Sequence, residues 1–232
     1  MLAVLEMALR QSRALALTTL VLLGLAAPAA AVTVSYNGDF EQIDIGDGKR
    51  FSLLAPSSVP GWQTTDRAIE LWANGFNGVT SYSGDQHAEL NAYTFGTLFQ
   101  TITGVGVGGA IELSFAHRAR QGTDVMRVLL TDLGDDGEYG TADDTDLFDR
   151  QFSATTAAWQ VNQSSDFGSI SALGGDLRLS FTAVSTGSGS PSVGNFIDDV
   201  TVDVSPVPLP AAGLLLLGAL AGLGFARRAR RA

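Results

Sequence analysis

The 232-residue chain contains no cysteine and two histidines, His87 and His117. Without cysteine no disulfide can cross-link the fold, so outside the cell the protein must be stabilised by its core and by any metal it binds. The chain also lacks G-x-S-x-G and H-E-x-x-H, the motifs of α/β-hydrolases and zinc proteases. We therefore expect a protein that is not an enzyme.

Basic residues are scarce as well. The chain has 14 Lys and Arg against 24 Asp and Glu, and six of the 14 lie in the two terminal segments described next. The part between these segments keeps 8 basic and 23 acidic residues, a formal charge of about −15. Such a surface repels phosphate backbones, so we expect no nucleic-acid partner. It suits divalent cations and a matrix of hydrated sugars.

Residues 1–31 have the features of a secretory signal peptide, handled by the Sec export machinery. Arg10 and Arg13 form the positive n-region, residues 14–25 form the apolar h-region, and Ala29 to Ala31 form a small-residue cleavage site. We predict cleavage after Ala31. The alternative is a membrane anchor that stays in place.

The last segment, 206–232, combines a proline-rich start, an apolar run and a basic end. Residues 211–226 would form a helix of about 24 Å, slightly shorter than the ~30 Å hydrocarbon core, so it would span a membrane marginally. The basic end places the tail in the cytoplasm and the bulk of the protein outside. The preceding prolines favour an extended, accessible segment that a membrane-embedded processing enzyme could cut. The alternative is an ordinary single-pass anchor.

This tail resembles the PEP-CTERM class of sorting signals, in the variant that reads V-P-L-P-A. The residues that carry the resemblance are Val207, Pro208, Leu209, Pro210, Ala211, Arg227, Arg228, Arg230 and Arg231. The resemblance implies export by a Gram-negative bacterium that makes exopolysaccharide, transient anchoring in the inner membrane, and recognition by an exosortase. The final location would be the cell surface or the extracellular space. Leu209 stands where Glu is usual, which leaves open which sorting enzyme reads the tail.

Residues 32–205 show the pattern of an all-β domain. Ile111, Leu113 and Phe115 alternate with polar or small residues, turn signals recur along the chain, and no interior segment has a sustained 3.6-residue apolar stripe. We predict an antiparallel jelly-roll β-sandwich of roughly eight to ten strands. The expected strands are 69–73, 87–92, 97–103, 110–119, 125–133, 147–154, 177–184 and 196–204.

Short landmarks along this domain resemble galactose-binding-like jelly rolls, including carbohydrate-binding modules. They are 37–41 (N-G-D-F-E), 60–62 (P-G-W), 88–91 (A-E-L-N), Gln100, 113–115 (L-S-F) and 196–200 (F-I-D-D-V). The resemblance implies sugar binding. It also implies a structural calcium between Glu41 and Asp198 or Asp199. The alternative for Asp198 is a hydrogen-bonded carboxylate at a strand end.

An acidic loop is a second candidate calcium site. Between residues 132 and 149 the carboxylates of Asp135, Asp136, Asp143, Asp144 and Asp146 surround two glycines. Carboxylate oxygens are the ligands that calcium prefers, and like charges this close repel one another unless a cation neutralises them. The spacing is not that of an EF-hand, because no Glu closes a twelve-residue loop. The alternative is a solvated acidic hairpin loop without an ion.

The third candidate is a sugar-binding face. Ile69 and Leu71 share one side of an expected strand, so Glu70 and Trp72 share the other. If the first side faces the core, Trp72 is an exposed platform for a sugar ring, with Glu70, Asn74 and Asn91 available to bind hydroxyl groups. The alternative is that a loop buries Trp72.

These patterns together predict a non-enzymatic exported protein of the envelope or extracellular matrix that binds polysaccharide through a β-sandwich. Two other functions stay open. One is a secreted glycan hydrolase that uses paired carboxylates, although no spacing singles out a pair. The other is a structural or adhesive surface protein without sugar specificity.

Overall fold

The computed structural model of the chain describes residues 31–46 and 50–205. The predicted signal peptide up to residue 30 and the sorting tail, 206–232, lie outside the described residues. No helix within 31–46 and 50–205 is long and apolar enough to cross a membrane.

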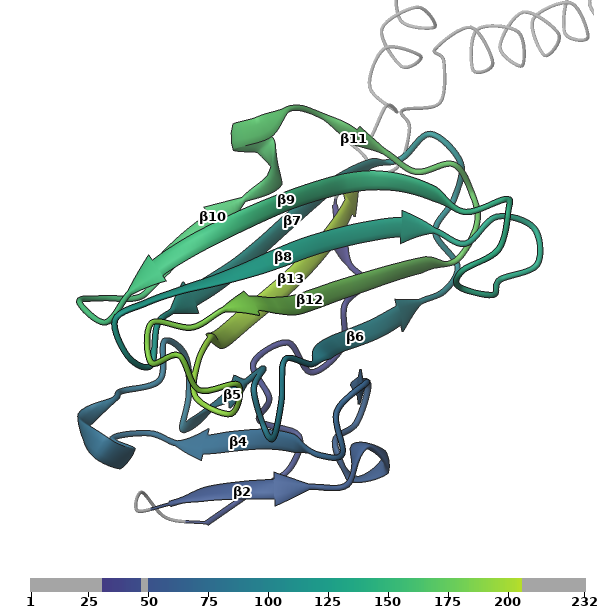
Figure 1. Cartoon of the computed structure of the whole chain (residues 1–232). Coiled ribbons are helices and arrows are strands. Elements are labelled where there is room, and N and C mark those ends of the chain that lie inside the picture. Colours follow the sequence, from purple (N-terminus) through teal and green to yellow (C-terminus); the bar gives the residue numbers. More distant parts are fainter. Residues whose placement is uncertain (1–30, 47–49, 206–232) are drawn as a thin grey trace, which may run out of the picture. The chain divides into compact units, whose positions relative to one another are not determined.

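The elements in this part of the chain are thirteen strands and three short 3-10 helices (Figure 1). They are β1 Val32–Thr33, β2 Phe51–Leu54, η1 Pro56–Ser58, β3 Gln63–Thr64, β4 Ile69–Ala73, η2 Phe76–Gly78, β5 Gln86–Glu89, β6 Thr97–Ile102, β7 Ala110–Arg118, β8 Thr123–Asp132, β9 Thr145–Thr155, β10 Gln160–Gln163, η3 Ser164–Phe167, β11 Ile170–Ser171, β12 Leu177–Ser185 and β13 Phe196–Ser205.

The strands form two antiparallel sheets. Sheet A has the order β10-β7-β13-β5-β4-β2, with β1 beside β13 and β11 beside β7. Sheet B has the order β3-β6-β12-β8-β9. Strands β5, β7, β10 and β13 lie in sheet A, whereas β6, β8, β9 and β12 lie in sheet B. With the two-residue strand β11 set aside, this is the jelly-roll arrangement of eight strands. Figure 1 looks onto sheet B, whose strands lie in front of β7 and β13. The predicted all-β sandwich is confirmed for this part of the chain.

All eight expected strands are present, displaced at their ends by at most a few residues. The structure adds five strands that the sequence pattern did not predict, namely β1, β2, β3, β10 and β11. None is longer than four residues, which is too short for an alternating pattern to stand out. The expected total of eight to ten strands is therefore too low.

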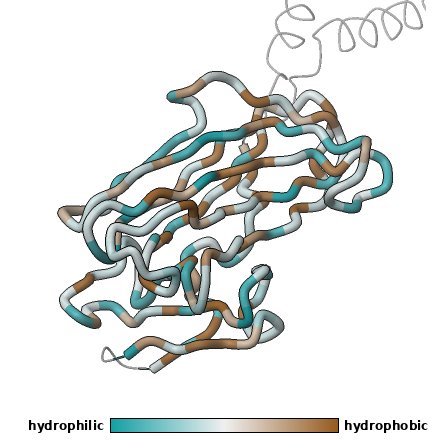
Figure 2. Tube along the Cα trace, in the orientation of Figure 1, coloured by the Kyte–Doolittle hydropathy of each residue, from teal (hydrophilic) through white to brown (hydrophobic). Residues whose placement is uncertain are grey.

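The core lies between the two sheets and is made by the inward-facing residues of each strand. On β7 these are Ile111, Leu113 and Phe115, and they pack against residues of sheet B such as Phe181 and Phe152. Figure 2 shows the resulting alternation of hydrophobic and hydrophilic positions along the strands. The loop between β8 and β9, at the right of that view, is largely hydrophilic.

Candidate functional site

Trp72 and Glu70 lie on the outer face of sheet A, as the strand alternation predicts, but that face is covered. Trp72 is 1% exposed. Its ring packs against Phe76 of η2 and Phe196 of β13, with centroid distances of 4.7 and 4.9 Å. The guanidinium of Arg120 lies 4.6 Å from the ring centre. Of the two alternatives, the structure shows burial, so Trp72 cannot present an open platform to a sugar.

Glu70 belongs to a buried ionic cluster beneath this cover. It accepts a hydrogen bond from the indole N–H of Trp72 at 2.7 Å and lies opposite Glu89 of β5. Glu89 accepts two hydrogen bonds from Arg120, at 2.9 and 3.1 Å, and one from the Gly194 N–H at 2.8 Å. Burial is the largest cause that raises the pKa of both carboxyls. Burial and the neighbouring Glu70 raise the pKa of Glu89 to about 9, so the pair keeps one proton at neutral pH.

The other two predicted ligand residues do not join Glu70 and Trp72 in one open site. Asn91 is buried and donates to the Pro191 carbonyl at 3.0 Å, so it supports the loop before β13. Asn74 accepts a hydrogen bond from the Ser81 N–H at 3.1 Å. It lines a cavity of about 430 Å³ together with Glu41 and Asp85. Only movement of the covering loops could bring Glu70, Trp72 and Asn91 to a ligand.

Both histidines lie on strands of sheet A, His87 on β5 and His117 on β7, and both are buried and uncharged at neutral pH. Burial lowers the pKa of His87 to about 3 and that of His117 to about 4. The ring of His87 packs against Phe196 and Trp159, and His117 shares a 3.0 Å hydrogen bond with Asn195. Neither ring is exposed, so neither can act as a base toward a polymer at the surface.

Glu41 and Asp198, which the sequence joins in a calcium site, hold the same loop. Glu41 Oε1 accepts the N–H groups of Asp85 and Gln86 at 2.7 and 2.9 Å. Asp198 Oδ2 accepts the N–H groups of Tyr82 and Ser83, both at 2.9 Å. Burial raises the pKa of Asp198 to about 7, against the lowering effect of these N–H groups. The two carboxylates therefore hold adjacent parts of the segment 82–86.

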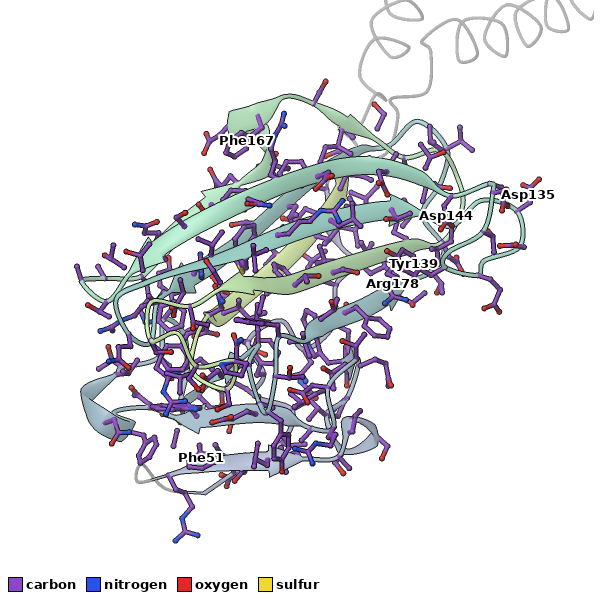
Figure 3. The ribbon with its side chains drawn as sticks, in the orientation of Figure 1. Phe51, Asp135, Tyr139, Asp144, Phe167 and Arg178 are labelled. Carbon is purple, nitrogen blue, oxygen red and sulfur yellow. The ribbon has the colours of Figure 1, made fainter. Side chains whose placement is uncertain are left out.

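In the acidic loop the carboxylates are directed mainly to the loop's own backbone and hydroxyl groups. Asp143 accepts from the Thr141 hydroxyl at 2.7 Å and from the Asp135 N–H at 2.8 Å, which holds its pKa below the usual value. Asp144 Oδ2 accepts the Gly140 N–H, and Asp136 accepts the Glu138 N–H. The remaining predicted residue, Asp146, accepts from the Thr131 hydroxyl at 2.9 Å, and Figure 3 shows Asp135 at the outer tip of the loop.

Within residues 31–46 and 50–205, no three His, Cys, Asp or Glu side chains are grouped so that they could hold a metal ion. In both predicted calcium sites, carboxylate oxygens accept hydrogen bonds from backbone N–H groups, so these oxygens are already occupied by donors. Asp144 Oδ1 differs, because it is buried and has no hydrogen-bond partner in the described part of the chain. Calcium at either place therefore stays a prediction.

The outer face of sheet B, in contrast, carries exposed polar groups on several strands. Arg127 pairs with Asp149 through two hydrogen bonds of 2.6 and 2.7 Å between β8 and β9. Thr97 and Thr182 share a 2.8 Å hydrogen bond between β6 and β12. Leu129, Thr131 and Ser180 on the same face are buried. The hydroxyl and charged groups around them could exchange their hydrogen bonds with a hydroxyl-rich ligand.

At one end of this face an arginine is held between two aromatic rings. The Arg178 guanidinium on β12 lies 3.6 Å from the ring centre of Phe99 on β6 and 3.9 Å from that of Tyr139 in the acidic loop. Figure 3 shows Tyr139 and Arg178 side by side. Tyr139 is 47% exposed, so the acidic loop presents an aromatic ring to solvent at the edge of the face. We call Phe99, Arg178 and Tyr139 the aromatic–arginine stack.

Comparison with known proteins finds solved structures of similar fold. No protein-family model matches the chain, and no curated protein matches it. The similar structures include carbohydrate-binding modules. A CBM4 module has 15% identity and a TM-score of 0.41 over 74% of this chain and 99% of its own. TmCBM61, in complex with β-1,4-galactotriose, has 14% identity and a TM-score of 0.46 over 74% and 97%. The xylan-binding CBM22-1 domain of Paenibacillus barcinonensis Xyn10C has 11% and 0.45 over 78% and 99%. At this similarity the likeness carries no argument about what the chain binds.

The aromatic–arginine stack is the arrangement that the sequence pattern missed. Phe99 and Arg178 lie on neighbouring strands and alternate with core residues, so their position on an outer face could have been predicted. The position of Tyr139 could not, because it depends on how a loop of twelve residues between β8 and β9 folds back over sheet B.

Proposed function

We propose that residues 32–205 form a non-enzymatic module that binds extracellular polysaccharide through the outer face of sheet B. The aromatic–arginine stack is the observation that carries this proposal. Sugars bind proteins by placing their C–H faces on aromatic rings while polar groups take the hydroxyls, and Arg178 fixes the ring of Tyr139 in place before any ligand arrives. A ring held in this way loses little entropy when a ligand covers it.

The buried carboxylates support a binding rather than a hydrolytic role. Glu70 and Glu89 are neighbours, as a glycosidase pair would be, but both are enclosed beneath Trp72 and the loop before β13. A polysaccharide could not reach them, and hydrolysis needs both carboxyls at the scissile bond. Their arrangement with Arg120 instead fastens loops to sheet A.

The binding proposal is tested by comparing exposed aromatic residues on different faces. Residues 32–205 are screened on a glycan array, and the affinity for each ligand found is measured by isothermal titration calorimetry. We expect Tyr139→Ala and Arg178→Ala to weaken binding at least about tenfold, equivalent to about 1.4 kcal/mol. Tyr82→Ala is the matched control, because Tyr82 is similarly exposed but its N–H contacts Asp198 on the sheet A side. Unchanged affinity in both stack variants would exclude this face, and the absence of any ligand would favour a structural or adhesive role.

We also propose that the two ends of the chain deliver the module out of the cytoplasm. The support is the sequence alone: a signal peptide to Ala31 and a tail with the V-P-L-P-A pattern, an apolar run and terminal arginines. Replacing Val207, Pro208, Leu209 and Pro210 by Ala should leave an uncut, membrane-associated form in fractionated cells. Equal processing of this variant and the natural chain would contradict recognition of the motif.

A further inference from the structure

The edge strand β2 carries two large apolar side chains that point to solvent. Phe51 is 43% exposed and Leu53 is 40% exposed, and both lie on the outer face of sheet A. Phe51 does not move freely, because its ring lies 6.0 Å from Phe76 and 6.3 Å from Trp72. Natural sheets usually protect their edges with charge, proline or a bulge, yet β2 reads F-S-L-L.

The register of β2 shows which backbone groups face its open side. The Ala73 N–H donates to the Arg50 carbonyl at 3.0 Å, so residue 50 exchanges hydrogen bonds with β4. Hydrogen-bonded and non-hydrogen-bonded pairs alternate in an antiparallel ladder, so Ser52 and Leu54 also face β4. The N–H and C=O groups of Phe51 and Leu53 are therefore directed away from β4, toward the edge of the sheet.

A second copy of the same strand would satisfy these groups. A two-fold axis through Ser52 places Phe51 of each copy opposite Leu53 of the other, on the same face. Each of these two pairs would exchange two backbone hydrogen bonds, which gives four, and would stack an aromatic ring against a leucine. A register shifted by one residue would bring the outer face of one copy to the same side of the joint sheet as the inner face of the other, which would separate the apolar side chains of the two copies. The side chains of Phe51 and Leu53 therefore favour the register centred on Ser52.

Charge does not hinder pairing at this edge, and among the uncharged edge strands β2 carries two exposed apolar side chains whereas β10 carries one, Val161. The domain carries a formal charge of about −15, which opposes association through most of its surface. The segment from Phe51 to Leu54 has no charged residue. The edge strand of sheet B, β9, bears Asp146, Asp149 and Arg150, which hinder pairing of one copy with another.

We propose that two copies of this protein associate through β2, in the register centred on Ser52, to form one continuous sheet. The interface is small, so we expect the association to be weak. The fraction of dimer should increase as the protein concentration is raised from low micromolar to about 1 mM. This self-association does not depend on the polysaccharide proposal, since β2 lies in sheet A and the aromatic–arginine stack lies on sheet B.

The first test is sedimentation velocity of residues 32–205 across that concentration range. We expect the sedimentation coefficient of the natural sequence to rise toward that of a dimer and that of Leu53→Lys to stay monomeric, with unchanged circular dichroism. Val161→Lys is the control, because Val161 is 48% exposed on β10 at the opposite edge of sheet A. A monomer at every concentration, or equal loss of dimer in both variants, would overturn the proposal.

The second test uses the absence of cysteine in the chain. In the proposed register the two Ser52 residues form a non-hydrogen-bonded pair about 4.5 Å apart, within the range for a disulfide. We expect Ser52→Cys to give a covalent dimer under mild oxidation, well above the yield from Ser153→Cys on β9, which is exposed. Equal yields from the two variants would refute this register even if a dimer exists.

Discussion

Glu70 of β4 and Glu89 of β5 lie opposite each other, and both carboxyls are buried. One arginine, Arg120, forms an ion pair with Glu89. Two carboxylates and one guanidinium leave an excess negative charge in a site closed to water, which is costly. The pair avoids this cost by keeping one proton at neutral pH. This retained proton makes the free energy of unfolding depend on pH.

The first prediction concerns this dependence. Burial raises the pKa of both carboxyls above the 4.5 of a free glutamate, that of Glu89 to about 9, so above pH 4.5 the native state holds a proton that the unfolded chain has lost. The free energy of unfolding should therefore fall as pH rises from about 4.5, by at most about 1.4 kcal/mol per pH unit. Glu70→Gln, which keeps an acceptor for the Trp72 N–H and removes one of the two charges, should flatten this fall. Urea denaturation between pH 5 and 9 measures the free energy of unfolding, with the exposed Glu138→Gln as control. Parallel curves for all three proteins would contradict a proton shared by the buried pair.

Trp72→Ala should lower the free energy of unfolding. Its ring packs among Phe76, Phe196 and Arg120, so truncation leaves a large cavity and removes the indole donor to Glu70. We expect a loss of about 3–5 kcal/mol in the free energy of unfolding, measured by urea denaturation. Tyr139→Ala should cost much less, because its ring is half exposed. A fully stable Trp72→Ala protein would show that the covering segment does not pack on it.

Calcium should raise the melting temperature if either predicted site is real. Differential scanning fluorimetry with millimolar calcium and with a chelator tests both sites, since extracellular calcium sites bind at ~10⁻⁴ to 10⁻³ M. Asp144→Asn reports on the acidic loop, where Oδ1 of Asp144 is buried and without a partner among the described residues. Asp199→Asn reports on the other site, and Asn tolerates the positive φ of 49° at that position. If calcium and chelator both leave the melting temperature unchanged, neither site exists.

Gly38→Ala should destabilise the junction between the first segment and the last strand. The Val200 N–H donates to the Gly38 carbonyl at 3.0 Å, and a Cβ at Gly38 would overlap the Val200 carbonyl oxygen. Because backbone would have to move, we expect a cost of about 1–3 kcal/mol, seen as a lower melting temperature. Gly106→Ala is the control, since a Cβ there meets no atom within 4 Å. Equal melting temperatures would contradict the close approach of the two segments.

The sequence predicted the sandwich well because its long strands alternate. Ile111, Leu113 and Phe115 face the core as their period of two requires, and every expected strand is found. The short strands cannot be predicted in this way, because two to four residues carry no period. Pairing with β4 gives β2 its structure, which is a tertiary effect that local pattern does not show.

The candidate site was predicted less well, for one physical reason. Alternation correctly put Glu70 and Trp72 on the outer face of sheet A, but it cannot tell whether loops cover that face. Every residue of β4 and β5 is buried, including Gln86, His87 and Glu89, because η2, Arg120 and the loop before β13 lie over them. On sheet B the β8–β9 loop instead brings an exposed aromatic ring, that of Tyr139, to the edge of the face.

Val32 of β1 pairs with Val204 of β13, so the two ends of the domain leave it side by side. A short glycine linker could therefore join residue 205 to residue 32 without disturbing either sheet. New termini could be opened between Gly137 and Glu138, at an exposed turn of the β8–β9 loop. Such a circular permutant would fold around the same sandwich while freeing Tyr139 from its closed loop, and would separate the ring's own contribution from that of the loop that carries it.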